Sequence, residues 1–156
     1  AQRGGVVSVD IRFGDVYGPI APDSKVDILI GFEILEAIRA LKYTNDNTFI
    51  IINKEKIIPF TSNILGIKYP DIENYINKKK NVFLIDAVEL ANKAGTYKAV
   101  NTVMVGAVAA LNILPINMED VEEAIKLIFP KNFWDINIKA FKLGFENTKA
   151  LREAYQ

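Results

Sequence analysis

Short apolar runs with strand character alternate with segments of helical periodicity along this chain, and this alternation constrains its fold more than any other feature. The run Thr48–Ile52 (TFIII) is β-branched and aromatic, which is typical of a strand covered on both faces. Just before it, Glu33–Lys42 carries apolar residues at helical spacing. Strands that alternate with helices predict an α/β fold, a three-layer α/β/α sandwich around a mainly parallel sheet. The other expected strands are Lys25–Ile30 and Val82–Ile85, and the other expected helices are Pro70–Lys79, one between Asp86 and Gly95, Lys98–Asn112, one opening at Asn117, and Ile136–Tyr155.

The first expected strand differs from the others. From Val7 to Phe13 apolar and polar residues alternate strictly, and a period of two is typical of a half-buried strand. The turn-rich stretch between it and Lys25–Ile30 leaves no room for a crossover helix, so we expect one antiparallel edge and a mixed sheet. Ile57–Leu65 is ambiguous, with the composition of a short edge strand broken by Pro59. Residues 1–156 contain no repeat or linker and are expected to form one domain.

Several helix ends carry clear signals. Asp86 and Glu89 have the spacing of a capping box, and Gly95 is expected to end that helix. Asn117 and Asp120 repeat the same spacing at the start of an amphipathic helix. The inner stripe of this helix is expected to be Val121, Ala124, Ile125 and Ile128, and the final helix is expected to bury Ile138, Phe141 and Phe145.

The segment Lys98–Asn112 is apolar on nearly every side, so we expect it to be the most buried helix. Asn101 interrupts it, and a buried amide must find partners, either on a neighbouring loop or at an interface. Gly106 would permit close approach of a second element. For both residues a role in core architecture is favoured over a functional one.

The composition excludes several classes of function. The 156 residues contain no cysteine and no histidine, so neither a thiolate-ligated iron–sulfur cluster nor a Ser-His-Asp or Cys-His triad can form within them. The formal net charge is zero, which gives no global field to recruit nucleic acid or an anionic membrane. The longest apolar run, Val103–Leu111, is far shorter than the ~20 residues of a membrane-spanning helix. The missing cysteines fit a reducing, cytoplasmic compartment.

Candidate ligand-binding residues lie where predicted strands end, because open α/β sheets bind ligands at those ends. Glu33 follows the strand-ending Gly31, and it is either a functional carboxylate or, as we favour, a residue that stabilises the first helical turn. Asp86 is better explained as a helix cap than as a catalyst. We predict no catalytic residue and no metal ligand in this chain.

A second candidate site precedes the first alternating segment. Gly4 and Gly5 allow a ligand or partner to approach the backbone closely, and Arg3 beside them can form a fork to a carboxylate or phosphate. The alternative is a frayed terminus, and the residues alone do not favour either interpretation. On composition and pattern together, a subunit or binding module is favoured over a free-standing enzyme.

An ordered set of motifs resembles the gamma domain of the 2-oxoacid:ferredoxin oxidoreductases, most of all the beta subunit of indolepyruvate ferredoxin oxidoreductases. The resemblance covers essentially the whole chain, and its strength lies in the order of the motifs. The family also has an earlier strand, a turn of the form G-x-G-G-Q-G and a helix, which we expect to lie outside these 156 residues. The motifs are Ala1-Gln2-Arg3-Gly4-Gly5, Val16-Tyr17-Gly18-Pro19, Asp27–Glu33 with Leu35-Glu36-Ala37, Asp86-Ala87 with Glu89-Leu90-Ala91, Ala99-Val100-Asn101 with Val105-Gly106-Ala107, and Asn137–Phe141 with Gly144.

The resemblance implies a subunit of a complex that oxidatively decarboxylates an aryl 2-oxoacid such as indolepyruvate. In such a complex, thiamine diphosphate, Mg²⁺ and iron–sulfur clusters belong to a larger partner subunit, ferredoxin accepts the electrons and coenzyme A accepts the acyl group. This chain would hold none of these cofactors alone and would complete the complex beside the active site. The expected cofactor-binding or partner-facing residues are Gln2, Arg3, Gly4, Gly5, Gly31, Glu33 and Asn101.

Two alternatives stay open at this point. One is a gamma subunit that serves another 2-oxoacid, such as pyruvate or a branched-chain acid. The other is a stand-alone α/β ligand-binding module without a redox partner. In isolation we expect the chain to self-associate through exposed apolar surface.

Overall fold

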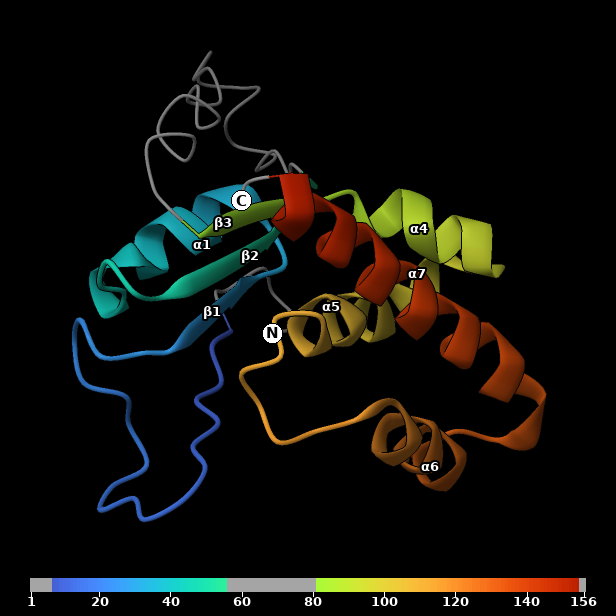
Figure 1. Cartoon of the computed structure of the whole chain (residues 1–156), viewed down its shortest axis with the longest axis horizontal. Coiled ribbons are helices and arrows are strands. Elements are labelled where there is room, and N and C mark those ends of the chain that lie inside the picture. Colours follow the sequence, from blue (N-terminus) through green and yellow to red (C-terminus); the bar gives the residue numbers. More distant parts are fainter. Residues whose placement is uncertain (1–6, 56–80, 155–156) are drawn as a thin grey trace.

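The computed structural model describes residues 7–55 and 81–154, and its centre is a three-stranded parallel sheet (Figure 1). The strands are β1 (Ile28–Gly31), β2 (Phe49–Asn53) and β3 (Val82–Ile85), in the order β1-β2-β3. Both strand pairs are parallel, with Ile51 opposite Ile30 on one side and Phe83 on the other. The predicted α/β class and these three predicted strands are confirmed.

The central strand β2 is buried on both faces, as its uninterrupted apolar sequence predicted. Ile51 points into a core that includes residues of three helices, whereas Ile50 and Ile52 pack on the opposite face against a different helix. Figure 1 shows this layered arrangement. The helix on the side of Ile50 and Ile52 is α1 (Ile34–Arg39), continued by a 3₁₀ turn at Ala40–Tyr43, and the helices on the other side are α4 (Ala87–Ala94), α5 (Val100–Ala109) and α7 (Trp134–Ala154).

Two glycines bring α5 and α7 into direct backbone contact. A Cβ atom on Gly106 would lie 2.1 Å from the carbonyl oxygen of Phe141, and one on Gly144 would lie 2.0 Å from that of Val103. Neither position can hold a larger side chain without separating the helices. The expectation that Gly106 permits close approach of a second element is confirmed, and the element is α7.

The helix α5 is apolar on nearly every side and is largely buried, as predicted. Its fully or nearly fully buried positions include Thr102, whose hydroxyl donates a 2.7 Å hydrogen bond to the side-chain oxygen of the buried Asn137 on α7. The Asn137 amide nitrogen in turn donates to the Phe133 carbonyl at 2.9 Å. A paired polar bridge therefore lies beside the glycine crossing, and it fixes the relative register of the two helices.

The helix α6 (Met118–Ile128) begins with the capping box that the sequence predicted. The Asn117 side chain accepts from the backbone N–H of Asp120, and the Asp120 carboxylate accepts from the backbone N–H of Asn117. The predicted inner stripe is only partly right, because Ile125 is buried but Ile128 is 73% exposed. The reason is tertiary: α6 lies mainly against α7, so the helix covers one narrow stripe. In α7, Phe141 is fully buried, while Ile138 and Phe145 are half-buried.

The predicted strand at Val7–Phe13 is wrong for the described structure. These residues form no strand, and their side chains are exposed. The segment is extended, but among the described strands the pairing is entirely parallel, so the expected antiparallel edge is not formed there. Alternation in sequence indicates an extended chain with two unlike faces, and it does not by itself supply a partner strand.

Three sequence predictions fall outside the residues that the structure describes. They are the candidate site at Gln2, Arg3, Gly4 and Gly5, the ambiguous segment Ile57–Leu65 and the expected helix Pro70–Lys79. Within the described ranges, no helix is both long enough and apolar enough to cross a membrane.

Candidate functional site

The carboxyl ends of the three parallel strands meet at one edge of the sheet, and this edge is the candidate site. Gly31 ends β1, Asn53 ends β2 and Ile85 ends β3. The backbone N–H of Lys54 donates to the Ile85 carbonyl at 2.8 Å, and that of Ile34 donates to the Glu55 carbonyl at 3.4 Å. The segments that leave the strands are therefore tied together by backbone bonds.

Asn53 is the central polar residue of this edge. Its side chain is almost completely buried, with a relative exposure of 1%. The amide nitrogen donates to the Phe32 carbonyl at 3.2 Å and to Glu55 Oε2 at 3.3 Å, and the amide oxygen accepts from the backbone N–H of Ala87 at 3.1 Å. One side chain thus joins the segments that follow all three strands. The sequence places Asn53-Lys54-Glu55 at a strand end, where ligands gather in such sheets, but it did not lead us to assign Asn53 a role.

Glu33 serves as the N-cap of α1. Its Oε2 atom accepts a 3.0 Å hydrogen bond from the backbone N–H of Glu36, and the residue is buried. The favoured sequence interpretation, that this carboxylate stabilises the first helical turn, is confirmed.

Gly31 is required by packing between β1 and α1. A Cβ atom at this position would lie 2.4 Å from Cβ of Ala37, which is closer than two carbons can approach. The glycine therefore lets the helix lie directly on the strand. This contact accounts for the residue without a ligand.

Asp86 caps α4, as predicted, by accepting from the backbone N–H of Glu89 at 3.0 Å. At the other end of the helix, Gly95 has a φ of +130°, a conformation that favours glycine. On the exposed face of α4, the hydrogen bond and charge of Lys93 lower the pKa of Glu89 below its ordinary value. The acidic residues near the start of α4 are thus engaged in stabilising that helix.

Asn101 does not lie in the core, contrary to the sequence expectation. It is exposed, and so is Val105 one turn later on the same face of α5. The helix is apolar around most of its circumference, but this stripe faces away from both the sheet and α7. The structure therefore brings Gly31 and Glu33 together at the sheet edge and leaves Asn101 elsewhere.

The donor groups of residues 7–55 and 81–154 do not form a metal site, and the sequence has no ligands for an iron–sulfur cluster. The 156 residues supply neither thiolate nor imidazole ligands. Within residues 7–55 and 81–154 no group of three acidic side chains lies close enough to hold a metal ion. At the sheet edge, Glu33 and Asp86 accept hydrogen bonds from helix N-termini, and Glu55 accepts from Asn53. We therefore assign no reaction step through such a group to these residues.

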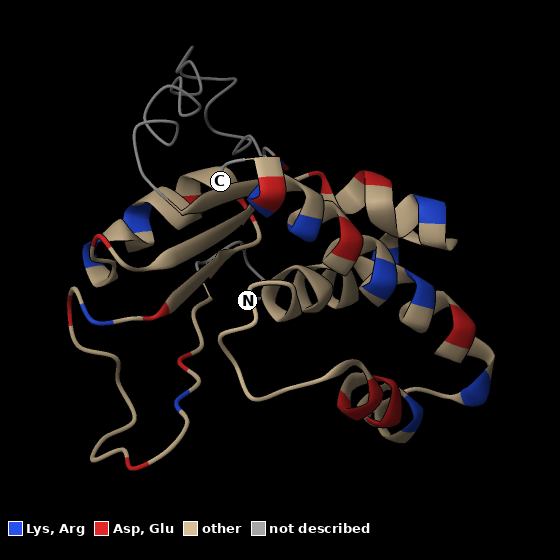
Figure 2. Cartoon of the chain, viewed as in Figure 1, with Lys and Arg blue, Asp and Glu red and all other residues tan. Residues whose placement is uncertain are grey.

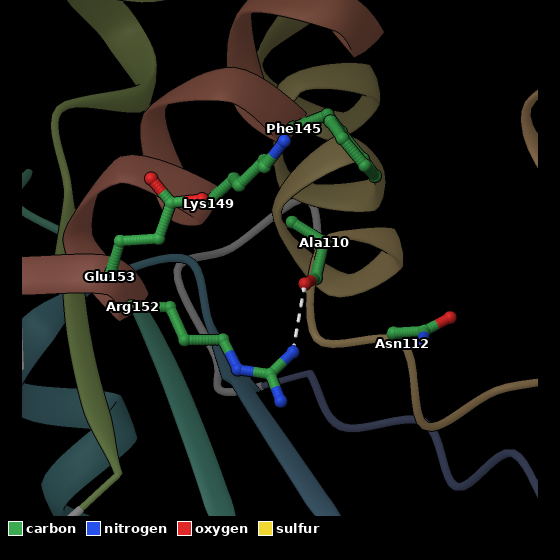
Figure 3. A pocket seen from close by; sticks show the side chains of 6 residues that line it. All are labelled: Ala110, Asn112, Phe145, Lys149, Arg152 and Glu153. Atoms are coloured by element: carbon green, nitrogen blue, oxygen red, sulfur yellow. Dashed lines mark hydrogen bonds between the residues drawn. The ribbon is translucent and has the colours of Figure 1, made fainter. Parts of the chain in front are cut away.

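A separate cavity of about 320 Å³ lies between the carboxyl end of α5 and the last turns of α7 (Figure 3). Arg152 reaches across it and donates to the carbonyls of Leu111 at 2.8 Å and Ala110 at 3.4 Å. These carbonyls belong to the end of α5, where a cation is favourable. The arginine therefore joins two helices, and we interpret the cavity beside it as space left between them by packing.

Charged side chains of both signs are interleaved over the described helices (Figure 2). The helix α6 is the most acidic, with Glu119, Asp120, Glu122 and Glu123 beside the single Lys126, and Glu122 pairs with Lys142 of α7 at 3.0 Å.

The family of the chain is shown by its similarity to known proteins. Residues 1–147 match the pyruvate ferredoxin/flavodoxin oxidoreductase family. The chain is 39% identical over 149 residues to the indolepyruvate oxidoreductase subunit IorB of Archaeoglobus fulgidus, an alignment that covers 93% of this chain and 74% of that protein. It is 33% identical over 157 residues to the IorB subunit of Pyrococcus horikoshii, covering 97% of this chain and 78% of the relative.

Two solved structures have the same fold. The gamma subunit of a keto/oxoacid ferredoxin oxidoreductase from Geobacter sulfurreducens superposes with a TM-score of 0.56 at 23% identity, and covers 80% of this chain. The pyruvate oxidoreductase subunit PORC from Thermotoga maritima gives a TM-score of 0.55 at 21% identity, again over 80% of this chain. This chain spans 64% of the length of each. With a family match over nearly its whole length and long alignments to IorB subunits, the chain belongs to the pyruvate ferredoxin/flavodoxin oxidoreductase family.

Proposed function

We propose that this chain is the non-autonomous, gamma-type subunit of an indolepyruvate:ferredoxin oxidoreductase. The complex would convert an aryl 2-oxoacid and coenzyme A into an acyl-CoA and CO₂, with the two electrons passed to ferredoxin. The observation that carries the proposal is the similarity to IorB subunits along 93% to 97% of this chain. On this proposal residues 1–156 form one gamma-type domain.

The proposal places the cofactors in a larger partner subunit. Thiamine diphosphate would stabilise the carbanion left by decarboxylation, and the clusters would carry electrons to ferredoxin. The absence of thiolate and imidazole ligands from this chain supports that division of labour. The role left to the described residues is to hold a rigid surface beside the partner.

Two regions would form that surface. One is Gln2-Arg3-Gly4-Gly5, where the arginine can form a fork to a carboxylate or phosphate of coenzyme A or of the partner. The other is the sheet edge near Gly31 and Glu33, where Asn53 holds the three strand ends together. The exposed Asn101 on α5 is a further partner-facing candidate.

A gamma subunit that serves pyruvate or a branched-chain 2-oxoacid is the second candidate. The common gamma subunit of the pyruvate and ketoisovalerate oxidoreductases of Pyrococcus furiosus is 28% identical over 131 residues, covering 84% of this chain. The lower identity favours the indolepyruvate assignment over this one. A stand-alone ligand-binding module is the remaining alternative.

The test is an assay of viologen reduction by the chain alone, by the thiamine-dependent subunit of the same organism alone, and by both together. Indolepyruvate, pyruvate and 2-ketoisovalerate serve as substrates, each with coenzyme A. We expect activity only from the mixture, with indolepyruvate the best substrate. Preference for pyruvate or ketoisovalerate would favour the second candidate, and turnover by this chain alone would exclude the subunit role.

A further inference from the structure

We draw no further inference here: the strongest candidate, the exposed apolar surface at the carboxyl end of α6, where Leu127 and Ile128 are 83% and 73% exposed, carries none because nothing in the structure shows what covers it.

Discussion

At the scale of single residues, Gly106 and Gly144 are the described glycines at which an added Cβ atom would come closest to other atoms. Each would carry its Cβ into a backbone carbonyl of the other helix. A larger residue must push α5 and α7 apart, and the polar bridge between Thr102 and Asn137 would be lost with that movement.

We expect Gly106→Ala and Gly144→Ala each to lower the free energy of unfolding by about 1–3 kcal/mol or more, because overpacking at a backbone contact has no rotamer to relieve it. Urea denaturation measures the change. Gly18→Ala is the control, since the nearest atom to a Cβ there is 4.0 Å away. If Gly106→Ala left the free energy of unfolding unchanged or raised it, the close backbone contact between α5 and α7 would be contradicted.

The role of Asn53 depends on its side-chain amide both donating and accepting hydrogen bonds. Asn53→Asp keeps the shape of the side chain but replaces the donor that serves the Phe32 carbonyl and the Glu55 carboxylate with an acceptor. The expected loss of unfolding free energy is about 1–3 kcal/mol, with faster amide exchange in all three segments that the residue joins. Asn47→Asp, at an exposed position, should change little. Equal unfolding free energies of the two variants would contradict the role of Asn53 in joining the three strand ends.

Arg3 lies outside the described residues, so its proposed role rests on the sequence alone. In the assembled complex, Arg3→Ala should slow acyl transfer to coenzyme A or weaken subunit association, because it removes a forked donor beside two glycines. Stopped-flow measurement of acyl-CoA formation and a subunit titration separate the two effects. If kinetics and assembly are both unchanged, this site should be abandoned.

At the scale of elements, the capping box of α6 is expected to stabilise a helix that has little tertiary support. Only one α6 residue, Ile125, is buried. Asn117→Ala should therefore cost about 1 kcal/mol of local stability and accelerate amide exchange across α6 selectively. Asn101→Ala, at an exposed position on α5, is the control. Unchanged exchange in α6 would mean that packing, not the cap, holds the helix.

Elements with a purely local cause were predictable from the sequence. The strand β2 followed from its uninterrupted β-branched run, and the starts of α4 and α6 followed from Asp86 and Asn117. Errors arose where a neighbour decides the outcome. The alternation at Val7–Phe13 indicated an extended segment but not what covers it, and Ile128 has helical spacing on a face that no described element reaches.

The candidate site was predictable only in part, for the same reason. Glu33 and Asp86 were assigned correctly because a helix cap acts over three residues of sequence. Asn53 was expected at a strand end, but its joining role was not predicted, because its partners Phe32 and Ala87 come from segments that only the fold brings together. Asn101 was misplaced because an apolar helix was taken to be covered all round.

At the scale of the whole molecule, the described sheet edge is built to hold the segments after the three strands together. The polar groups at this edge cap helices and join strand ends, and the sequence supplies no cluster ligands. The family was evident from the order of the sequence motifs and is established by the match over residues 1–147.

The most direct test of the central claim is co-expression of this chain with the thiamine-dependent subunit of the same organism, followed by size-exclusion chromatography with detection of cluster absorbance. We expect one brown peak in which both chains are present in equal amounts and which reduces viologen with indolepyruvate. A colourless peak of this chain separate from a partner that is fully active alone would contradict the claim that it is a subunit of the complex.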